Sequence, residues 1–325
     1  MTGPGGRSRP TTGPGGRSTN VDLSTTVGSV RLPNPVMTAS GTAGHGAELA
    51  QYVDLSSLGA VVVKSLSAEP WAGNPAPRVT EVDAGMLNSV GLQNPGVEAW
   101  LEDELPPLLA TGARVVASIW GFTVEAYEKA AAALAAAPPE VVAVEVNLSC
   151  PNVESRRAMF AHSPRLTAEA LDATAVCGRP RWAKLSPNVT DLTEIAGAAL
   201  DAGADALTLV NTVMGMAIDP DTRRPRLGAG GGGLSGPAIR PVAVRAVYDV
   251  CSAFPDAPVV GVGGVAAGEH VAELLLAGAS AVQVGTATFA DPRAPGRVLA
   301  GFERWCRSHG VVRAADLVGR ARADT

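Results

Sequence analysis

The sequence predicts an α/β fold and, within that class, a (β/α)8 TIM barrel. After residue 21, eight short runs rich in Val, Ile, Leu and Ala recur along the chain, and such runs are typical of parallel strands buried on both faces. They alternate with eight helix-like segments, which is the pattern of a closed parallel barrel. An open doubly wound sheet usually has fewer strands and a Gly-rich first turn, and no GxGxxG motif follows the first run.

The predicted elements follow one another without overlap. The strands are expected at residues 36–38, 60–64, 114–119, 141–147, 181–185, 206–210, 259–262 and 281–284. The helices are expected at about 46–55, 96–110, 123–137, 167–178, 191–202, 236–253, 268–277 and 296–308. Thr123, Thr167 and Asp191 each precede a glutamate by two or three residues, a spacing typical of capped helix N-termini.

We expect residues 1–20 to form a disordered tail and residues 21–325 to form one barrel domain. The heptad TGPGGRS occurs twice in the tail, and its residues bury too little apolar surface to offset the entropy of ordering. Two inserts, 65–95 and 211–235, follow predicted strands and are longer than ordinary connections. Long loops at strand ends of a barrel usually carry function, so we expect these inserts to contribute to a site.

Composition and charge exclude several classes of function. The formal charge of −5 and the pI near 5.5 leave no basic surface for nucleic acid. No apolar run is long enough to span a membrane, and the N-terminus lacks the apolar segment of a secretory signal, so we expect a cytoplasmic protein. A disulfide framework or a metal site is not expected, because the four cysteines are far apart: Cys150, Cys177, Cys251 and Cys306.

Polar side chains gather where predicted strands end. The carboxyl ends of barrel strands meet at one rim, so these side chains are expected to converge on one site. A single lysine or asparagine at such a position commonly caps a loop, but six strand ends with such groups favour a binding site. The residues concerned are Lys64, Ser65, Asn147, Ser149, Cys150, Asn152, Lys184, Asn211, Thr212, Gly263, Gly264, Gly285 and Thr286.

Glycine-rich turns follow the last two predicted strands. GVGGV spans residues 261–265, and VGTA spans residues 284–287. Glycine lets backbone N–H groups approach an anion closely, and the loops after strands seven and eight are the usual phosphate site of this fold. Either turn alone is also compatible with a ligand-free tight turn. Together they indicate a ligand or cofactor that carries a phosphate.

Cys150 lies in the motif NLSCPN, on a loop after the fourth predicted strand. A thiol at the mouth of a barrel can act as a base or a nucleophile. Of the four histidines only His162 is near Cys150 in sequence, so the Cys–His pair of a cysteine protease is not indicated. Proton abstraction coupled to hydride transfer needs only one such group.

These motifs resemble those of the class 1 dihydroorotate dehydrogenases over about residues 21–310. The similar segments, in the order of the family, are TASGTAG (38–44), KSLS (64–67), GNPAPR (73–78), MLNSVGLQNPG (86–96), NLSCPN (147–152), KLSPNVTD (184–191), the pair 211–212, GGLSGPAIRP (232–241) and the two glycine turns. The resemblance implies an FMN-dependent barrel enzyme that oxidises dihydroorotate to orotate in pyrimidine biosynthesis.

The resemblance also implies roles for individual residues. Cys150 would be the catalytic base that removes a proton from carbon 5 of dihydroorotate. The substrate would contact Lys64, Asn88, Ser89, Val90, Gly91, Leu92, Asn147, Asn211 and Thr212. FMN would contact Ser40, Lys64, Ser65, Ser118, Asn147, Lys184, Val210, Gly236, Gly263, Gly264, Gly285 and Thr286. Ser118 departs from the family, which usually has an FMN-binding asparagine there; serine is shorter and has no amide hydrogen to donate.

The segment GGLSGPAIRP resembles subclass 1B more than 1A. In 1B enzymes a separate subunit with FAD and a 2Fe–2S cluster passes electrons to NAD, so the resemblance implies such a partner and a homodimer or heterotetramer. Two alternatives stay open. One is a related FMN enzyme acting on dihydropyrimidines such as dihydrouracil, which lack the carboxylate that Lys64 would bind. The other is a non-catalytic flavin-binding subunit, against which the intact Lys64, Cys150 and Lys184 argue.

Overall fold

The computed structural model describes residues 21–149 and 159–322. The predicted tail, residues 1–20, and Cys150 therefore lie outside the described residues. Among the helices of the described part, none is both long and apolar enough to cross a membrane.

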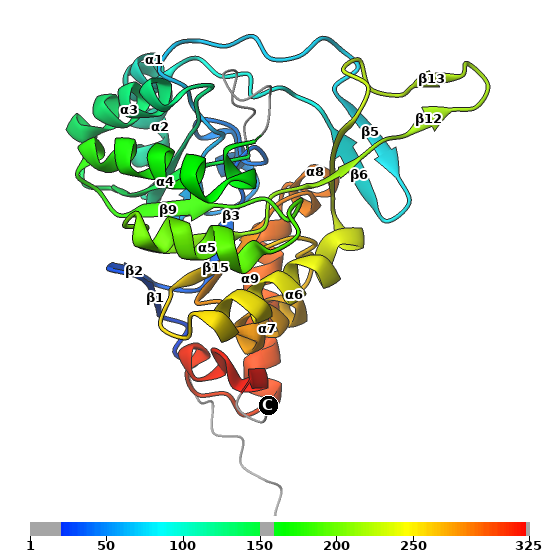
Figure 1. The fold of residues 1–325 in the computed structure, drawn as a ribbon. Helices are drawn as coiled ribbons and strands as arrows, with labels where there is room; N and C mark the ends of the chain where they lie inside the picture. The colour runs from blue at the N-terminus through cyan, green and yellow to red at the C-terminus, as the bar shows by residue number, and fades with distance from the viewer. Residues whose placement is uncertain (1–20, 150–158, 323–325) are drawn as a thin grey trace, which may run out of the picture.

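Eight parallel strands form the barrel, which confirms the predicted fold class (Figure 1). In chain order they are β3 (Val36–Thr38), β4 (Val61–Val62), β7 (Val115–Ile119), β8 (Val141–Asn147), β9 (Arg181–Lys184), β10 (Ala206–Leu209), β15 (Val259–Val262) and β16 (Ala281–Val284). Each lies within two residues of its predicted position. Between β3 and β4 the barrel closes through backbone hydrogen bonds, from the N–H of Gly59 to the carbonyl of Val36 at 2.8 Å and from the N–H of Thr38 to the carbonyl of Ala60 at 3.3 Å. The Thr38 side chain adds a third bond, because its Oγ1 accepts from the backbone N–H of Val62 at 2.9 Å.

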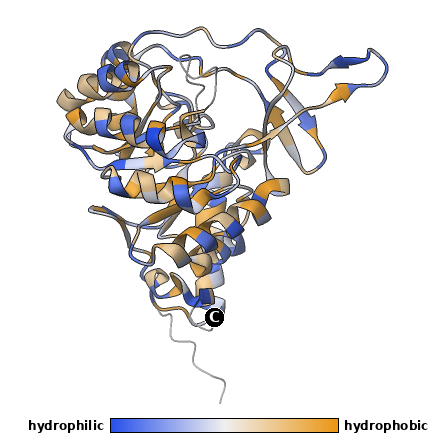
Figure 2. Cartoon of the chain, viewed as in Figure 1, coloured by the Kyte–Doolittle hydropathy of each residue, from blue (hydrophilic) through white to orange (hydrophobic). Residues whose placement is uncertain are grey.

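Helices cover the outside of the barrel. They are α1 (Val97–Ala99), α2 (Leu105–Ala110), α3 (Val124–Ala133), α4 (Pro164–Ala173), α5 (Leu192–Asp201), α6 (Arg240–Ala253), α7 (Gly268–Ala277), α8 (Ala287–Ala290) and α9 (Ala294–Ser308). In α9, Val298, Phe302 and Cys306 are buried at four-residue spacing, so one face of the helix packs on the barrel. Figure 2 shows hydrophilic and hydrophobic residues mixed along these outer helices, as expected for helices with one face in solvent.

Three helix predictions are wrong in detail. The segment 46–55 forms only two 3-10 turns, η1 (Glu48–Gln51) and η2 (Leu55–Ser57), because Asp54 is extended and its side chain accepts from the N–H of Ser56 to start a new turn. Between α1 and α2 a π-helical turn precedes two prolines, which lack the N–H that a continuous helix needs. Ser163 rather than Thr167 caps α4.

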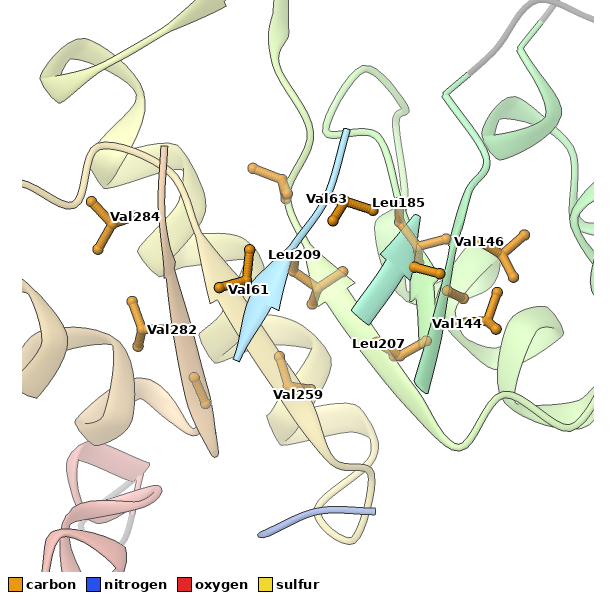
Figure 3. Close-up of a cluster of buried hydrophobic side chains, with 14 of the residues drawn as sticks. Val61, Val63, Val144, Val146, Leu185, Leu207, Leu209, Val259, Val282 and Val284 are labelled. Carbon is orange, nitrogen blue, oxygen red and sulfur yellow. The ribbon is translucent and has the colours of Figure 1, made fainter. Parts of the chain in front are cut away.

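Side chains of the strands alternate between two apolar layers. Those that point outward, such as Val61 and Leu207, pack under the helices (Figure 3). Those that point inward, such as Val62 and Trp182, fill the amino-terminal half of the barrel together with Val27 from the hairpin β1 (Thr25–Val27) and β2 (Val30–Leu32). Each fully buried Val or Leu stabilises the fold by about 1.5–3 kcal/mol relative to exposure. Within the barrel, as its described residues form it, the space left for a ligand therefore lies toward the carboxyl ends of the strands.

The two long inserts pair with each other to form a second sheet. Its four antiparallel strands, in order, are β11 (Val213–Gly215), β14 (Gly232–Ser235), β6 (Gly85–Asn88) and β5 (Val79–Val82). A short hairpin, β12 (Ile218–Asp219) and β13 (Arg224–Pro225), projects beyond it (Figure 1). Because Asn88 pairs with Gly233, this sheet joins the segment after β4 to the segment after β10. The length of the inserts predicts functional loops, but nothing in their sequence predicts this sheet.

Candidate active site

A cavity of about 780 Å³ lies at the carboxyl ends of the barrel strands, bordered by the inserted sheet. A volume in this range suits a cofactor together with a small substrate. Most residues predicted to form a site line it: Ser40, Lys64, Ser65, Asn88, Ser89, Val90, Gly91, Leu92, Asn147, Lys184, Val210, Asn211, Thr212, Gly236, Gly263, Gly264, Gly285 and Thr286. Their convergence on one cavity agrees with the prediction from strand ends.

Three predicted residues do not line the described cavity wall, and one of them, Asn152, lies outside the described residues. Cys150 lies outside the described residues, although Ser149, the residue before it, lines the cavity. Ser118 is fully buried on β7, behind Ser65, and its Oγ lies 2.8 Å from that of Ser65. Among residues 21–149 and 159–322, Ser118 is therefore linked to the cavity only through Ser65.

Lys184 is held by three acceptors inside the barrel. Its Nζ donates to Oε1 of Glu145 at 3.1 Å, to Oγ of Ser40 at 3.1 Å and to Oε1 of Gln283 at 3.3 Å. Glu145 and Gln283 are fully buried, and Nε2 of Gln283 donates to the other Glu145 oxygen at 2.6 Å. A buried charge is tolerated when it is paired and hydrogen-bonded, so this network fixes Lys184 at the floor of the cavity.

Asn147 is the centre of a second network. Its Nδ2 donates to Oγ of Ser65 at 3.2 Å, and its Oδ1 accepts from Nδ2 of Asn211 at 3.1 Å. The backbone carbonyl of Asn147 accepts from the hydroxyl of Tyr127 at 2.7 Å, which anchors the end of β8 to helix α3. The amide is therefore held in one orientation between β4, β8 and β10.

Lys64 carries a positive charge that no described residue neutralises. Its Nζ makes neither a hydrogen bond nor an ion pair with residues 21–149 or 159–322. The pKa of Lys64 is lowered below its usual 10.5, mainly by burial and to a smaller extent by the nearby charge of Arg78. The pKa of His45 is lowered to about 4, mainly by burial and to a smaller extent by the charge of Lys64, so this histidine is neutral near pH 7. An ammonium group without a counterion at a cavity wall favours a ligand with an anionic group.

Three glycines that line the cavity have no room for a side chain. Gly264 has a φ of +68°, and a Cβ there would lie 3.0 Å from backbone atoms of Arg240. Gly263 has a φ of +143°, and its Cβ would lie 2.6 Å from that of Ala243. Gly236 also has a positive φ, of +97°. These backbone conformations favour glycine and leave backbone groups exposed to the cavity.

The loop 88–92 is held against the cavity by the segment 71–78. Nε1 of Trp71 donates to the carbonyl of Gly91 at 2.9 Å, and Nδ2 of Asn74 donates to Oγ of Ser89 at 2.9 Å. Arg78 donates to the carbonyl of Asn74 at 2.6 Å. Asn74 of the motif GNPAPR, together with Trp71 before it, therefore fixes the position of the loop 88–92, which is the predicted substrate loop.

Sequence reasoning missed several residues of the site. Glu145 and Gln283 were not singled out, although a charged or amide residue inside an apolar run such as VAVEV or AVQV is a usable signal. Asn188 also lines the cavity, and its Nδ2 donates to the carbonyl of Thr212 at 3.0 Å. The remaining three cysteines are buried, and burial raises the pKa of Cys177 and raises those of Cys251 and Cys306 to about 11. None of these three is suited to be a nucleophile or base.

The barrel and its cavity define a class of protein: a (β/α)8-barrel enzyme whose site combines lysines, amides and glycine turns at the carboxyl ends of its strands. Comparison with known proteins narrows this class. A sequence model of dihydroorotate dehydrogenase matches residues 22–305. The chain belongs to the dihydroorotate dehydrogenase family.

Individual relatives are similar over nearly their full length. The chain is 47% identical over 299 residues to the dihydroorotate dehydrogenase B (NAD(+)) catalytic subunit of Geobacter sulfurreducens, covering 92% of this chain and 97% of that protein. It is 47% identical to the protein of the same name from Pelobacter propionicus, with 92% and 98% covered. It is 49% identical to a putative dihydroorotate dehydrogenase A (fumarate) of Solibacter usitatus, with 91% and 97% covered.

Proposed function

We propose that this protein is the catalytic subunit of a B-type dihydroorotate dehydrogenase, which oxidises dihydroorotate to orotate with FMN in pyrimidine biosynthesis. The observation that carries the proposal is that one cavity collects Lys64, Asn147, Lys184 and Asn211 together with the glycine turns after β15 and β16. Family membership and the names of the relatives support the same reading.

The residues present fit FMN. Gly236, Gly263 and Gly264 line the cavity in positive-φ conformations that favour glycine, so bare backbone faces the site, which suits the phosphate and ribityl chain, with Gly285 and Thr286 beside it. Ser40, Ser65 and Val210 would contact the ring, and Lys184 would place a fixed positive charge near it. FMN, when bound, supplies the hydride acceptor.

The anionic substrate would bind at the opposite part of the cavity. Lys64 supplies the charge for the carboxylate of dihydroorotate, and Asn147, Asn211 and Thr212 supply amide and hydroxyl groups for the pyrimidine ring. The loop 88–92 closes this part of the cavity. A dihydropyrimidine without a carboxylate would leave the buried ammonium of Lys64 without a partner, which disfavours such a substrate.

Cys150 is proposed as the base because of its position in NLSCPN, since it lies outside the described residues. Its thiolate takes the proton from carbon 5, the hydride leaves carbon 6, and the electron pair left at carbon 5 forms the new double bond. Ser149 lines the cavity, so the chain reaches the site immediately before Cys150.

The name of the relatives as catalytic subunits supports a partner that carries the electrons onward. The described residues hold no group of side chains suited to a metal ion, so we propose that a partner subunit with FAD and a 2Fe–2S cluster brings its own ligands. This assignment also makes NAD the expected final acceptor of electrons.

Substrate comparison tests the proposal. The purified protein should carry FMN in a one-to-one ratio and convert dihydroorotate much faster than dihydrouracil. Faster turnover of dihydrouracil would replace the proposal by dihydropyrimidine oxidation, and the absence of both FMN and orotate binding would indicate a different function.

A further inference from the structure

We infer that Ser118 is a positioning residue that fixes the hydroxyl of Ser65 as a hydrogen-bond donor toward the ligand in the cavity. The inference deepens the proposed function and rests on it, because the ligand concerned is FMN. It concerns the position where this chain has a serine that does not itself reach the cavity.

Two backbone N–H groups orient the amides of the network. The N–H of Thr212 donates to Oδ1 of Asn211 at 2.8 Å, so Nδ2 of Asn211 is the group that faces Asn147. The N–H of Ser149 donates to Oδ1 of Asn147 at 3.2 Å. Both backbone donors require the same arrangement, in which Nδ2 of Asn147 points to Oγ of Ser65. The amide orientations therefore follow from donors whose role is unambiguous.

Ser65 must then accept a hydrogen bond from Asn147, because an amide NH2 group only donates. Ser118 is fully buried, and among the described residues its Oγ has one hydrogen-bond partner, Oγ of Ser65 at 2.8 Å. The Ser118 hydrogen has no other acceptor there, and a buried hydroxyl hydrogen without an acceptor is unfavourable. Ser118 is therefore the donor of this pair, and Ser65 is the acceptor.

With both lone pairs of its oxygen engaged, Ser65 has only its own hydrogen left to offer. Ser65 lines the cavity, and within the described part of the chain its hydroxyl has no partner beyond Asn147 and Ser118. Its hydrogen therefore points into the cavity, toward an oxygen or nitrogen acceptor of FMN. Such a donor stabilises the more electron-rich reduced flavin more than the oxidised flavin.

The experiment measures FMN affinity and the midpoint potential of the bound flavin in Ser118→Ala, Ser65→Ala and the double variant. Thr208→Val is the matched control, because Thr208 on β10 is also fully buried but its hydroxyl has no partner among the described residues. Ser118→Thr, which keeps the hydroxyl, is the conservative variant.

Ser118→Ala should weaken FMN binding about threefold to tenfold, the loss expected for one hydrogen bond, and should lower the midpoint potential. Ser118→Thr should keep the FMN affinity and the midpoint potential of the wild-type protein, because it retains the hydroxyl. Thr208→Val should also leave both at the wild-type level. In the Ser65→Ala background, Ser118→Ala should have no further effect, because Ser118 acts only through Ser65.

An undiminished effect of Ser118→Ala in the Ser65→Ala background would overturn the inference, as would wild-type affinity and potential in Ser118→Ala itself. FMN binding by the wild-type protein distinguishes a failure of this inference from a failure of the proposed function. If wild-type protein does not bind FMN at all, the proposed function fails; if it binds FMN normally and Ser118→Ala behaves like Thr208→Val, only the role of Ser118 fails.

Discussion

The Nζ of Lys184 lies 3.1 Å from Oε1 of Glu145 inside the barrel, where the side chain of Glu145 is fully buried and that of Lys184 is 5% exposed. This pair joins β9 to β8, and Gln283 joins it to β16 on the far side of the barrel. A cation that lines the cavity is thus held by three strands, with its counterion Glu145 in the barrel interior. Such support from below is what a fixed electrostatic site requires.

Replacement of Glu145 by Gln should destabilise the protein by about 3–5 kcal/mol, because it leaves the buried ammonium of Lys184 without a counterion. Urea denaturation of the two proteins measures the difference. Asp249→Asn is the control, since the Arg245–Asp249 pair is exposed and its loss should cost less than about 1 kcal/mol. Equal effects of the two substitutions would contradict the role assigned to the buried pair.

Gly264→Ala should weaken FMN binding about tenfold or more. Its φ of +68° is strained for alanine, and the new Cβ would lie 3.0 Å from the backbone of Arg240, so the turn must move. Gly310→Ala is a matched control with a φ of +67° and nothing within 4 Å of the new Cβ. Titration of the apoproteins with FMN should show a normal Kd for Gly310→Ala; a normal Kd for Gly264→Ala would remove this turn from the cofactor site.

Lys64→Met should raise the KM for dihydroorotate by about 10- to 100-fold, the loss expected for a charge-assisted hydrogen bond to a carboxylate. Lys129→Met, which removes an exposed lysine of α3, should leave KM unchanged. Steady-state kinetics at one pH compares the three proteins. An unchanged KM in Lys64→Met would place the carboxylate elsewhere in the cavity.

The KM of the wild-type protein should also rise on the alkaline side. Burial and Arg78 lower the pKa of Lys64, so the ammonium group loses its proton at a pH below the usual 10.5 and the positive charge disappears as pH rises through that lowered value. Lys64→Arg keeps its charge over this range, so its KM should stay flat where that of the wild type climbs. The same alkaline rise in Lys64→Arg would assign the titration to another group.

The barrel could be predicted because each of its strands is recognisable from a few consecutive residues. Each strand is a short apolar run, and inward and outward residues such as Val62 and Val63 are both buried, so the eight runs stand out from the helices. The convergence of Lys64, Asn147 and Asn211 also followed, since the fold places all strand ends at one rim. The helix predicted at 46–55 was wrong, because the cap at Asp54 interrupts a sequence pattern that otherwise suits a helix.

The inserted sheet and the support of Lys184 could not be predicted, because both depend on residues far apart in sequence. Gly233 pairs with Asn88 across 145 positions, and neither segment has the regular alternation of a strand. Gln283 and Glu145 are 138 positions apart, and only the closed barrel brings them together. Pairing of this kind follows from the tertiary structure and not from any local pattern.

The rate at which bound flavin loses its absorbance after anaerobic mixing with dihydroorotate, compared between the wild-type protein and Cys150→Ala, tests the central claim most directly. The account predicts that both proteins bind FMN, that the wild type is bleached within the turnover time, and that Cys150→Ala is bleached about 10²- to 10⁴-fold more slowly, the range for loss of a general base. Bleaching of Cys150→Ala at the wild-type rate, or no bleaching of the wild-type protein by dihydroorotate, would contradict it.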